Sequence, residues 1–188
     1  MKNIIILLLL FLSNMISAQK TEIDSIISHE IKNLKENKIS DFFIIEKSCN
    51  GCIKLINVNE QDCNYGTSKL FIFWKEKDAT YFRKIDKCNS SKIRISNDIF
   101  NNFSAKTIRM KKETIKPYQT NKNSYVSSSH STFSEFYFVI GNKIERKIYD
   151  HFNLTNEKEK PNINFIYNNS LSIIKLEKVC DEIINRNQ

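Results

Sequence analysis

The cysteines hold most of the chemistry that this sequence can support. Cys49-Asn50-Gly51-Cys52 is a C-x-x-C pair, a spacing that closes a small ring on oxidation and can cycle between dithiol and disulfide. Where this motif opens a helix, the helix N-terminus lowers the thiol pKa, but Ile53 to Val58 here have the apolar alternation of a strand. Three interpretations stay open: a structural disulfide, which is favoured, a redox-active pair, and a metal knuckle.

The other cysteines are Cys63, Cys88 and Cys180, and the order of the expected strands assigns their partners. If residues 42–86 form a four-strand meander, Cys49 and Cys52 flank its first turn, and Cys63 and Cys88 lie at the opposite end, about 20 Å away. This predicts Cys49–Cys52 and Cys63–Cys88 disulfides, with Cys180 a buried free thiol. It argues against one zinc held by all four cysteines, since a Zn–S bond is only about 2.3 Å long. No metal site is expected.

His130 is a second candidate for chemistry. It lies in a run of serines, residues 127–131, with Glu135 nearby. A serine beside a histidine raises the hypothesis of a hydrolase, because a base must lie within hydrogen-bond reach of its nucleophile. The sequence has no G-x-S-x-G elbow, so a polar loop is the favoured interpretation.

A basic stretch from Lys106 to Lys122 is the candidate for binding an acidic polymer or an anionic surface. Arginine, the preferred side chain for bidentate phosphate recognition, supplies only five of the 29 basic residues, so a solvated surface is favoured. The side chains that would form the polyanion site are Arg109, Lys111, Lys112 and Lys116.

Glycine is scarce, and this bears on cofactors. Gly51, Gly66 and Gly141 are the three glycines of the chain, too few for a Gly-rich phosphate loop. The sequence therefore argues against Rossmann and P-loop nucleotide binding, and we expect no cofactor.

The N-terminus has the pattern of a secretory signal peptide. Lys2 precedes nine apolar residues, 4–12, and the small residues Ser17 and Ala18 follow. Nine apolar residues are too few to span a bilayer, and no later segment is apolar enough. We predict that residues 1–18 are a signal peptide and that residues 19–188 form one domain in the periplasm or outside the cell, where disulfides persist.

Periodicity predicts helices at both ends of the mature chain and hairpins between them. Residues 21–37 and 171–185 have apolar side chains at helical spacing, and residues 118–131 and 153–164 are polar and irregular. Residues 97–103 fit one or two helical turns, 107–115 fit either a helix or a strand, and Ile93 and Ile95 fit an edge strand. The expected hairpins join 41–48 to 53–58 through a type I′ turn at Asn50-Gly51, 70–74 to 80–85, and 133–140 to 143–149 around Gly141-Asn142.

This order of elements predicts an α+β fold, an antiparallel sheet built from hairpins with an N-terminal and a C-terminal helix packed on it. For function, the sequence favours an exported binding or interaction module without catalysis, of unknown partner. One alternative is a thiol–disulfide redox protein that uses Cys49 and Cys52. The other is a hydrolase built around His130.

Overall fold

The computed structural model describes residues 22–52, 63–88, 90–140 and 143–187, and the chain divides into two compact units, 1–40 and 41–188. In the first unit, residues 22–36 form a helix in which Ile23, Ile27 and Ile31 recur at helical spacing, as predicted. The predicted signal peptide lies outside the described residues. None of the helices within the described ranges is long and apolar enough to cross a membrane.

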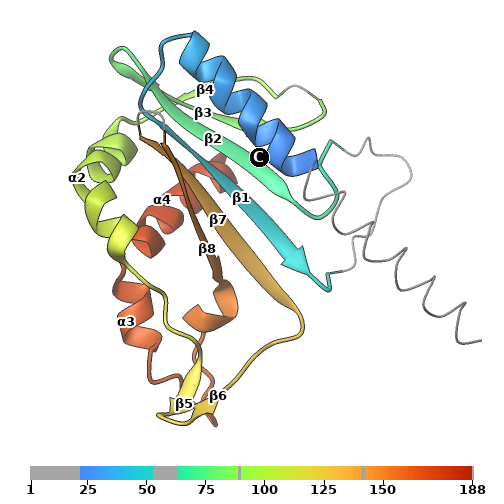
Figure 1. The fold of residues 1–188 in the computed structure, drawn as a ribbon, viewed down its shortest axis with the longest axis vertical. Helices are drawn as coiled ribbons and strands as arrows, with labels where there is room; N and C mark the ends of the chain where they lie inside the picture. Colours follow the sequence, from blue (N-terminus) through green and yellow to red (C-terminus); the bar gives the residue numbers. More distant parts are fainter. Residues whose placement is uncertain (1–21, 53–62, 89, 141–142, 188) are drawn as a thin grey trace, which may run out of the picture. The chain divides into compact units, whose positions relative to one another are not determined.

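The second unit is built on a six-stranded antiparallel sheet with the strand order β4-β3-β2-β1-β7-β8 (Figure 1). With helices at both ends of the chain, this confirms the predicted α+β class. The strands of the sheet are β1 (Phe42–Asn50), β2 (Lys69–Glu76), β3 (Ala79–Ile85), β4 (Ile93–Ile95), β7 (Ser131–Ile140) and β8 (Lys143–Asp150). The remaining elements are α2 (Asp98–Lys112), the small hairpin β5 (Gln119–Asn121) and β6 (Ser124–Tyr125), the 3-10 helix η1 (His151–Leu154), α3 (Phe165–Ser170) and α4 (Ser172–Arg186).

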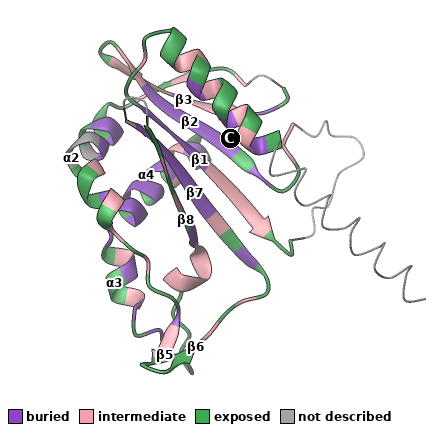
Figure 2. Cartoon of the chain, in the orientation of Figure 1, coloured by how far each residue is buried: buried purple, intermediate pink, exposed green. Residues whose placement is uncertain are grey.

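Phenylalanines form the core between one face of this sheet and the helices α2 and α4. The Phe43 ring stacks on Phe73 of β2 at 5.1 Å and meets Phe103 of α2 at 4.8 Å between centroids. Buried residues run along the middle of the central strands and the inward sides of both helices (Figure 2). Each ring removes a large apolar area from water, so this cluster fixes where α4 lies on the sheet.

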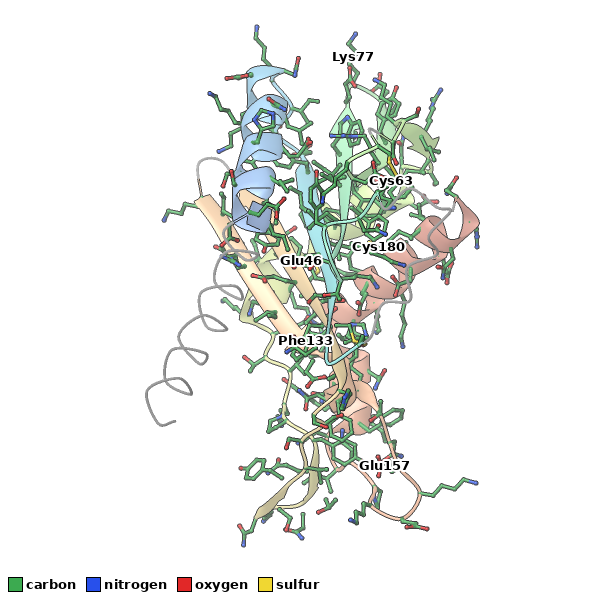
Figure 3. The ribbon with its side chains drawn as sticks, turned by 90° about the vertical axis from the view of Figure 1, so that its right-hand side faces the viewer. Glu46, Cys63, Lys77, Phe133, Glu157 and Cys180 are labelled. Atoms are coloured by element: carbon green, nitrogen blue, oxygen red, sulfur yellow. A yellow bond between two sulfur atoms is a disulfide. The ribbon has the colours of Figure 1, made fainter. Side chains whose placement is uncertain are left out.

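Two of the three predicted hairpins are confirmed. β2 and β3 pair from Leu70–Ile85 to Glu76–Ala79, and Lys77 at the tip has a φ of 55° (Figure 3). β7 and β8 pair from Phe133–Asp150 to Ile140–Lys143, although the predicted turn at Gly141-Asn142 lies outside the described residues. The predicted edge strand is confirmed too, because β4 pairs with β3 alone.

The first predicted hairpin and the four-strand meander are wrong. Between Phe43 and Lys47, β1 pairs on one side with β2 and on the other with β7, so no further strand can lie beside it there. The predicted strand at 53–58 lies outside the described residues. Gly51 has a φ of +73°, but Asn50 does not share a positive φ and instead continues β1, so the turn is not type I′.

Three segments differ from the prediction because tertiary contacts decide them. The two uncertain stretches around residues 97–115 form one helix, α2, whose Ile99, Phe103 and Met110 all reach the core. The predicted loop at 118–131 contains the short β5–β6 hairpin, and α3 was not expected. In this region, buried asparagine amides rather than apolar side chains fix the chain. The side-chain amide of Asn168 donates to the Lys116 carbonyl at 2.8 Å and accepts from the Lys116 N–H at 2.9 Å.

Candidate functional site

The C-x-x-C pair lies at the end of the central strand β1. Cys49 is opposite Thr132 of β7, and Asn50 is opposite Ser131, so the sheet holds the first cysteine in place. The Cα atoms of Cys49 and Cys52 are 5.7 Å apart, and the two side chains are joined as a disulfide. This is the first of the two predicted pairs.

His130 lies against the same loop. A Cβ built on Gly51 would lie 2.6 Å from Cδ2 of the His130 ring, a distance that no real side chain tolerates. The positive φ of Gly51 favours glycine at this position, and any larger residue would have to displace the imidazole of His130. The consequence is that the imidazole packs directly on the backbone between the two cysteines.

An open pocket of about 280 Å³ adjoins this disulfide, and we call it the cysteine pocket. It brings together three residues that the sequence singles out, Cys49, Cys52 and His130, and adds His151, which sequence reasoning missed as a site residue. His151 is the first residue of η1, where Asp150 accepts the Phe152 N–H at 2.7 Å and caps the helix. The remaining lining residues are Ser131, Thr132, Phe152 and Thr155.

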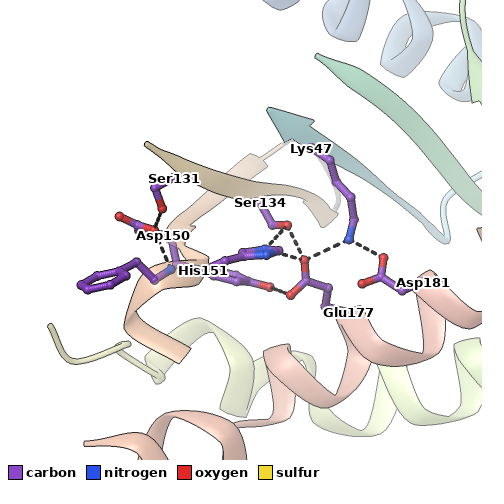
Figure 4. Close-up of polar contacts among 9 residues, drawn as sticks. Lys47, Ser131, Ser134, Asp150, His151, Glu177 and Asp181 are labelled. Atoms are coloured by element: carbon purple, nitrogen blue, oxygen red, sulfur yellow. Dashed lines mark hydrogen bonds and ion pairs between the residues drawn. The ribbon is translucent and has the colours of Figure 1, made fainter. Parts of the chain in front are cut away.

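Behind the cysteine pocket, polar side chains converge on Glu177 of α4 (Figure 4). Its carboxylate accepts hydrogen bonds from the Tyr149 hydroxyl at 2.8 Å and from Ser134, and it pairs with the Lys47 ammonium at 3.2 Å. His151 Nε2 lies 3.0 Å from the same carboxylate, and Lys47 also pairs with Asp181. We call these six residues the Glu177 cluster.

The electrostatics of the Glu177 cluster favour the ionised acid. Burial alone would raise the pKa of Glu177, but the hydrogen bond from His151, the Lys47 charge and the Ser134 hydroxyl outweigh it and lower the pKa to about 2. Burial, with the adjacent Glu177 charge second, raises the pKa of Tyr149 well above its usual value. Glu177 is thus a buried carboxylate, and Tyr149 is a buried neutral donor to it.

The Glu177 cluster contains a serine, a histidine and an acid, but not in the geometry of a catalytic triad. In a triad the nucleophile and the acid bind opposite nitrogens of the imidazole. Here Ser134 and Glu177 both face Nε2 of His151, at 2.8 and 3.0 Å, and Ser134 is fully buried. The cluster is suited to holding β1, β7 and α4 together.

The imidazole of His130, the hydrolase candidate, lies within hydrogen-bond reach of Ser129. Oγ of Ser129 lies 3.0 Å from Nδ1 of His130, and both residues are exposed. Ser128 Oγ donates to the His130 carbonyl at 2.7 Å and accepts from its N–H at 3.3 Å. Such contacts between adjacent residues are those of a polar turn. The hydrolase hypothesis stays a prediction.

A second pocket, of about 470 Å³, lies on the same face of the sheet, and we call it the lysine pocket. Phe71 and Phe82 are among its apolar lining residues, and Lys69 and Lys84 are its two basic ones. No motif in the sequence marks this pocket, because it forms only when β2 and β3 pair and the segments before and after them, with Asn187 from the end of the chain, come together. The other lining residues are Asn64, Ser90, Ser91, Ile93 and Asn187.

The wall of the lysine pocket is braced by the second predicted disulfide. Cys63 and Cys88 are bonded with their Cα atoms 5.3 Å apart, and the Lys87 N–H donates to the Cys63 carbonyl at 2.9 Å. Asp86 accepts the Ser90 hydroxyl and N–H and the Cys88 N–H. Burial would raise the pKa of Asp86, but these bonds and the Lys84 charge outweigh it and lower the pKa.

Three of the four candidate side chains in the basic stretch have partners among their neighbours. Arg109 pairs with Glu113 at 3.2 Å, Lys111 pairs with Glu145 at 2.9 Å, and the Lys116 ammonium lies 4.3 Å from the Tyr167 ring centroid. Lys112 is exposed at the end of α2. These pairings favour the solvated surface over the polyanion site, which stays a prediction.

Cys180 is a buried free cysteine of α4, in the position that the sequence predicts. Burial, and next the nearby Asp181 charge, raise the pKa of its thiol well above the usual value, so the thiol stays protonated. Within the described residues, no group of three side chains of the metal-binding types is arranged to hold a metal ion.

No protein-family model, no curated protein and no solved structure matches this chain.

Proposed function

We propose that this chain is an exported binding module that takes a small organic anion with an apolar body into the lysine pocket. The observation that carries the proposal is the pairing of two cationic side chains, Lys69 and Lys84, with the aromatic side formed by Phe71 and Phe82. A pocket of about 470 Å³ is within the usual size range for small-molecule sites. Binding in this pocket requires no catalytic group.

The proposed ligand class follows from the lining chemistry. The Lys84 ammonium is 3.5 Å from Asp86, which leaves it able to share its charge with a second anion, and Lys69 is exposed at the start of β2. The hydroxyl of Ser91 and the amide of Asn187 supply further donors. A carboxylate or phosphate group would bind these donors, and an aryl or alkyl group would lie against the phenylalanines.

Rigidity of the wall supports a binding role. The Cys63–Cys88 disulfide anchors Cys88, and the hydrogen bonds to Asp86 anchor Ser90, at the end of β3. A preformed site avoids the ordering cost that a flexible loop pays on binding. The disulfides also support the export part of the proposal, since they persist in oxidising compartments, and the signal pattern at residues 1–18 agrees with it.

Paired probes test the proposal. Benzoate, 3-phenylpropionate, hexanoate and phenyl phosphate would each be titrated beside the neutral alcohol or amide of the same shape, with backbone amide shifts as the measurement. We expect at least one anion to shift the resonances of Phe82 and Ile93, and its neutral analogue to bind about tenfold more weakly, as loss of one charge-assisted contact implies.

Three variants complete the test. Lys69→Ala and Lys84→Ala should each weaken binding of that anion, whereas Lys178→Ala, at an exposed position of α4 outside the pocket, should not. If no anion of the set shifts these resonances at millimolar concentration, or if neutral analogues bind equally well, the lysine pocket is not an anion site.

A further inference from the structure

We propose that the Cys49–Cys52 pair is a thiol–disulfide exchange centre that accepts two electrons from a dithiol of a polypeptide, with His130 as the proton donor. The motive is the convergence of two histidines from different segments on one C-x-x-C disulfide at an open pocket. This inference concerns a different site from the lysine pocket and is independent of the ligand proposed there.

The two sulfurs are not equivalent, and this sets the direction of attack. Cys52 is exposed, whereas Cys49 is half-buried and held in β1 by its pairing with Thr132. A thiolate that approaches from solvent therefore meets Sγ of Cys52, and Cys49 is the leaving group. Exposure of the attacked sulfur and stabilisation of the departing thiolate are two determinants of the exchange rate.

The imidazole of His130 is placed to stabilise that departing thiolate. It packs on Gly51, between the two cysteines, and lines the pocket with both of them. A histidine beside a C-x-x-C pair supplies positive charge and a transferable proton near neutral pH. This replaces the helix N-terminus that serves the same purpose in other C-x-x-C proteins and that β1 does not provide.

The reaction balances as two exchanges. In the first, a substrate thiolate forms a bond to Sγ of Cys52, the Cys49–Cys52 bond breaks, and the Cys49 thiolate takes a proton from the His130 imidazolium. In the second, the other substrate thiolate attacks the substrate sulfur of the mixed disulfide, and Cys52 leaves as the thiolate and takes up a proton. The substrate dithiol is oxidised to a disulfide, and the protein is reduced by two electrons.

A polypeptide is the favoured source of the dithiol because the pocket is open along one side. Ser131 and Thr132 begin β7, and Phe152 offers an apolar contact for residues that flank a cysteine. A small thiol such as glutathione shares the reacting group but would gain little from these contacts. The experiment therefore includes both sources.

The Cys63–Cys88 disulfide serves as an internal control. Cys88 is exposed and Cys63 is half-buried, as in the other pair, but none of the described residues that line the adjacent lysine pocket is a histidine. The oxidised full chain would be mixed with one equivalent of a reduced two-cysteine peptide, quenched with an alkylating agent, and mapped by mass spectrometry. We expect Cys49 and Cys52 to become labelled, with one peptide disulfide formed per pair, while Cys63 and Cys88 remain oxidised.

Variants separate the roles of the residues. With the oxidised peptide, Cys49→Ser should trap a mixed disulfide on Cys52, and Cys52→Ser should trap at least about tenfold less on the half-buried Cys49. His130→Ala should slow reduction of the pair about tenfold at pH 7 and flatten the dependence of the rate on pH. His29→Ala is the matched control, because His29 is an exposed histidine of the first unit, and it should leave the rate unchanged.

Three results would overturn the proposal. One is reduction of Cys49–Cys52 no faster than that of Cys63–Cys88, which would make both disulfides structural. Another is an unchanged rate and pH profile in His130→Ala, which would remove His130 from the reaction. The third is reduction by glutathione as fast as by the peptide, which would remove the polypeptide as substrate.

Discussion

Two corners of the second unit each contain a disulfide, but they are stabilised in different ways. One is stabilised by the disulfide itself, and the other by buried charged side chains. At the Cys63–Cys88 corner, the disulfide joins segments 25 positions apart and holds the wall of the lysine pocket. At the Cys49–Cys52 corner, the bond joins residues only three positions apart, so it restrains very little of the chain. There the Glu177 cluster ties β1, β7, β8 and α4 together instead.

This difference indicates which of the two disulfides can be reduced with little loss of stability. A disulfide that restrains a long loop cannot open without a loss of stability, whereas one whose surroundings are fixed by other contacts can open at little structural cost. Stability measurements on variants at the two corners test whether one disulfide is structural and the other can be reduced.

The largest effect is expected at Glu177. Glu177→Ala removes the acceptor of the Ser134 and Tyr149 hydroxyls and the counter-charge of Lys47. Breaking a buried ion pair in this way costs about 3–5 kcal/mol, because the remaining polar groups stay buried without their partner. Chemical denaturation should show this loss of unfolding free energy.

Glu182 provides the matched control for that variant. It lies on the same helix, is largely exposed, and forms an i,i+4 pair with Arg186. Glu182→Ala should cost less than about 0.5 kcal/mol. Equal effects of the two substitutions would mean that the Glu177 cluster does not stabilise its corner.

The Cys63–Cys88 bond should give the next largest effect. A closed loop of 25 residues corresponds to about 3 kcal/mol on the chain-entropy estimate, so Cys63→Ser with Cys88→Ser should lower the melting temperature clearly. The same double variant should weaken anion binding in the lysine pocket, because the Ser90 segment loses its brace. An unchanged melting temperature would contradict the assignment of this bond as the structural one.

The sequence predicts the regular elements well because each depends on local patterning. The β2–β3 and β7–β8 hairpins, the strand β4 and the helix α4 follow from the spacing of apolar residues. Both cysteine pairs were also predicted, but through the wrong topology. Because β1 pairs directly with β2, the two disulfides lie toward the same end of the sheet, as the register of Lys47 with Lys69 and of Leu70 with Ile85 requires.

The missed features all depend on distant residues. Nothing local distinguishes Glu177 from the other acids of α4, and only its packing beneath Ser134 and His151 gives it a role. The same holds for Asn168, one of many asparagines in the sequence, whose buried amide pairs with the Lys116 backbone. The approach of His130 to Gly51 joins segments that no periodicity connects, although the lone glycine in the C-x-x-C loop was a signal.

Low pH should lower the unfolding free energy through protonation of Glu177. The pKa of Glu177 is lowered to about 2 in the folded state, below the value of an unfolded glutamate, so ionisation stabilises the fold above about pH 4.5. As the pH falls from there toward 2, the unfolded state binds a proton that the folded state does not, and up to roughly 3 kcal/mol of the unfolding free energy is lost.

Glu177→Gln isolates this contribution from other acids. The pKa values of Asp86 and Glu113 are lowered as well, so they add to the acid sensitivity of the whole protein and remain in the variant. The unfolding free energy should therefore fall less steeply between pH 5 and pH 2 in Glu177→Gln than in the unmodified chain. Parallel curves would show that Glu177 does not carry the acid sensitivity of this corner.

The smallest effect is expected for the bond that we propose to be reactive. Cys49→Ser with Cys52→Ser opens a ring of three positions, for which the chain-entropy relation gives about 1.6 kcal/mol, roughly half the value for Cys63–Cys88. β1 keeps its pairing with β7, since Cys49 and Asn50 contribute backbone hydrogen bonds there, and the Glu177 cluster is untouched. Denaturation of the two double serine variants side by side checks the ranking. A loss at Cys49–Cys52 as large as at Cys63–Cys88 would mean that the short ring holds the end of β1 in place, and that it cannot open and close during exchange without disturbing the sheet.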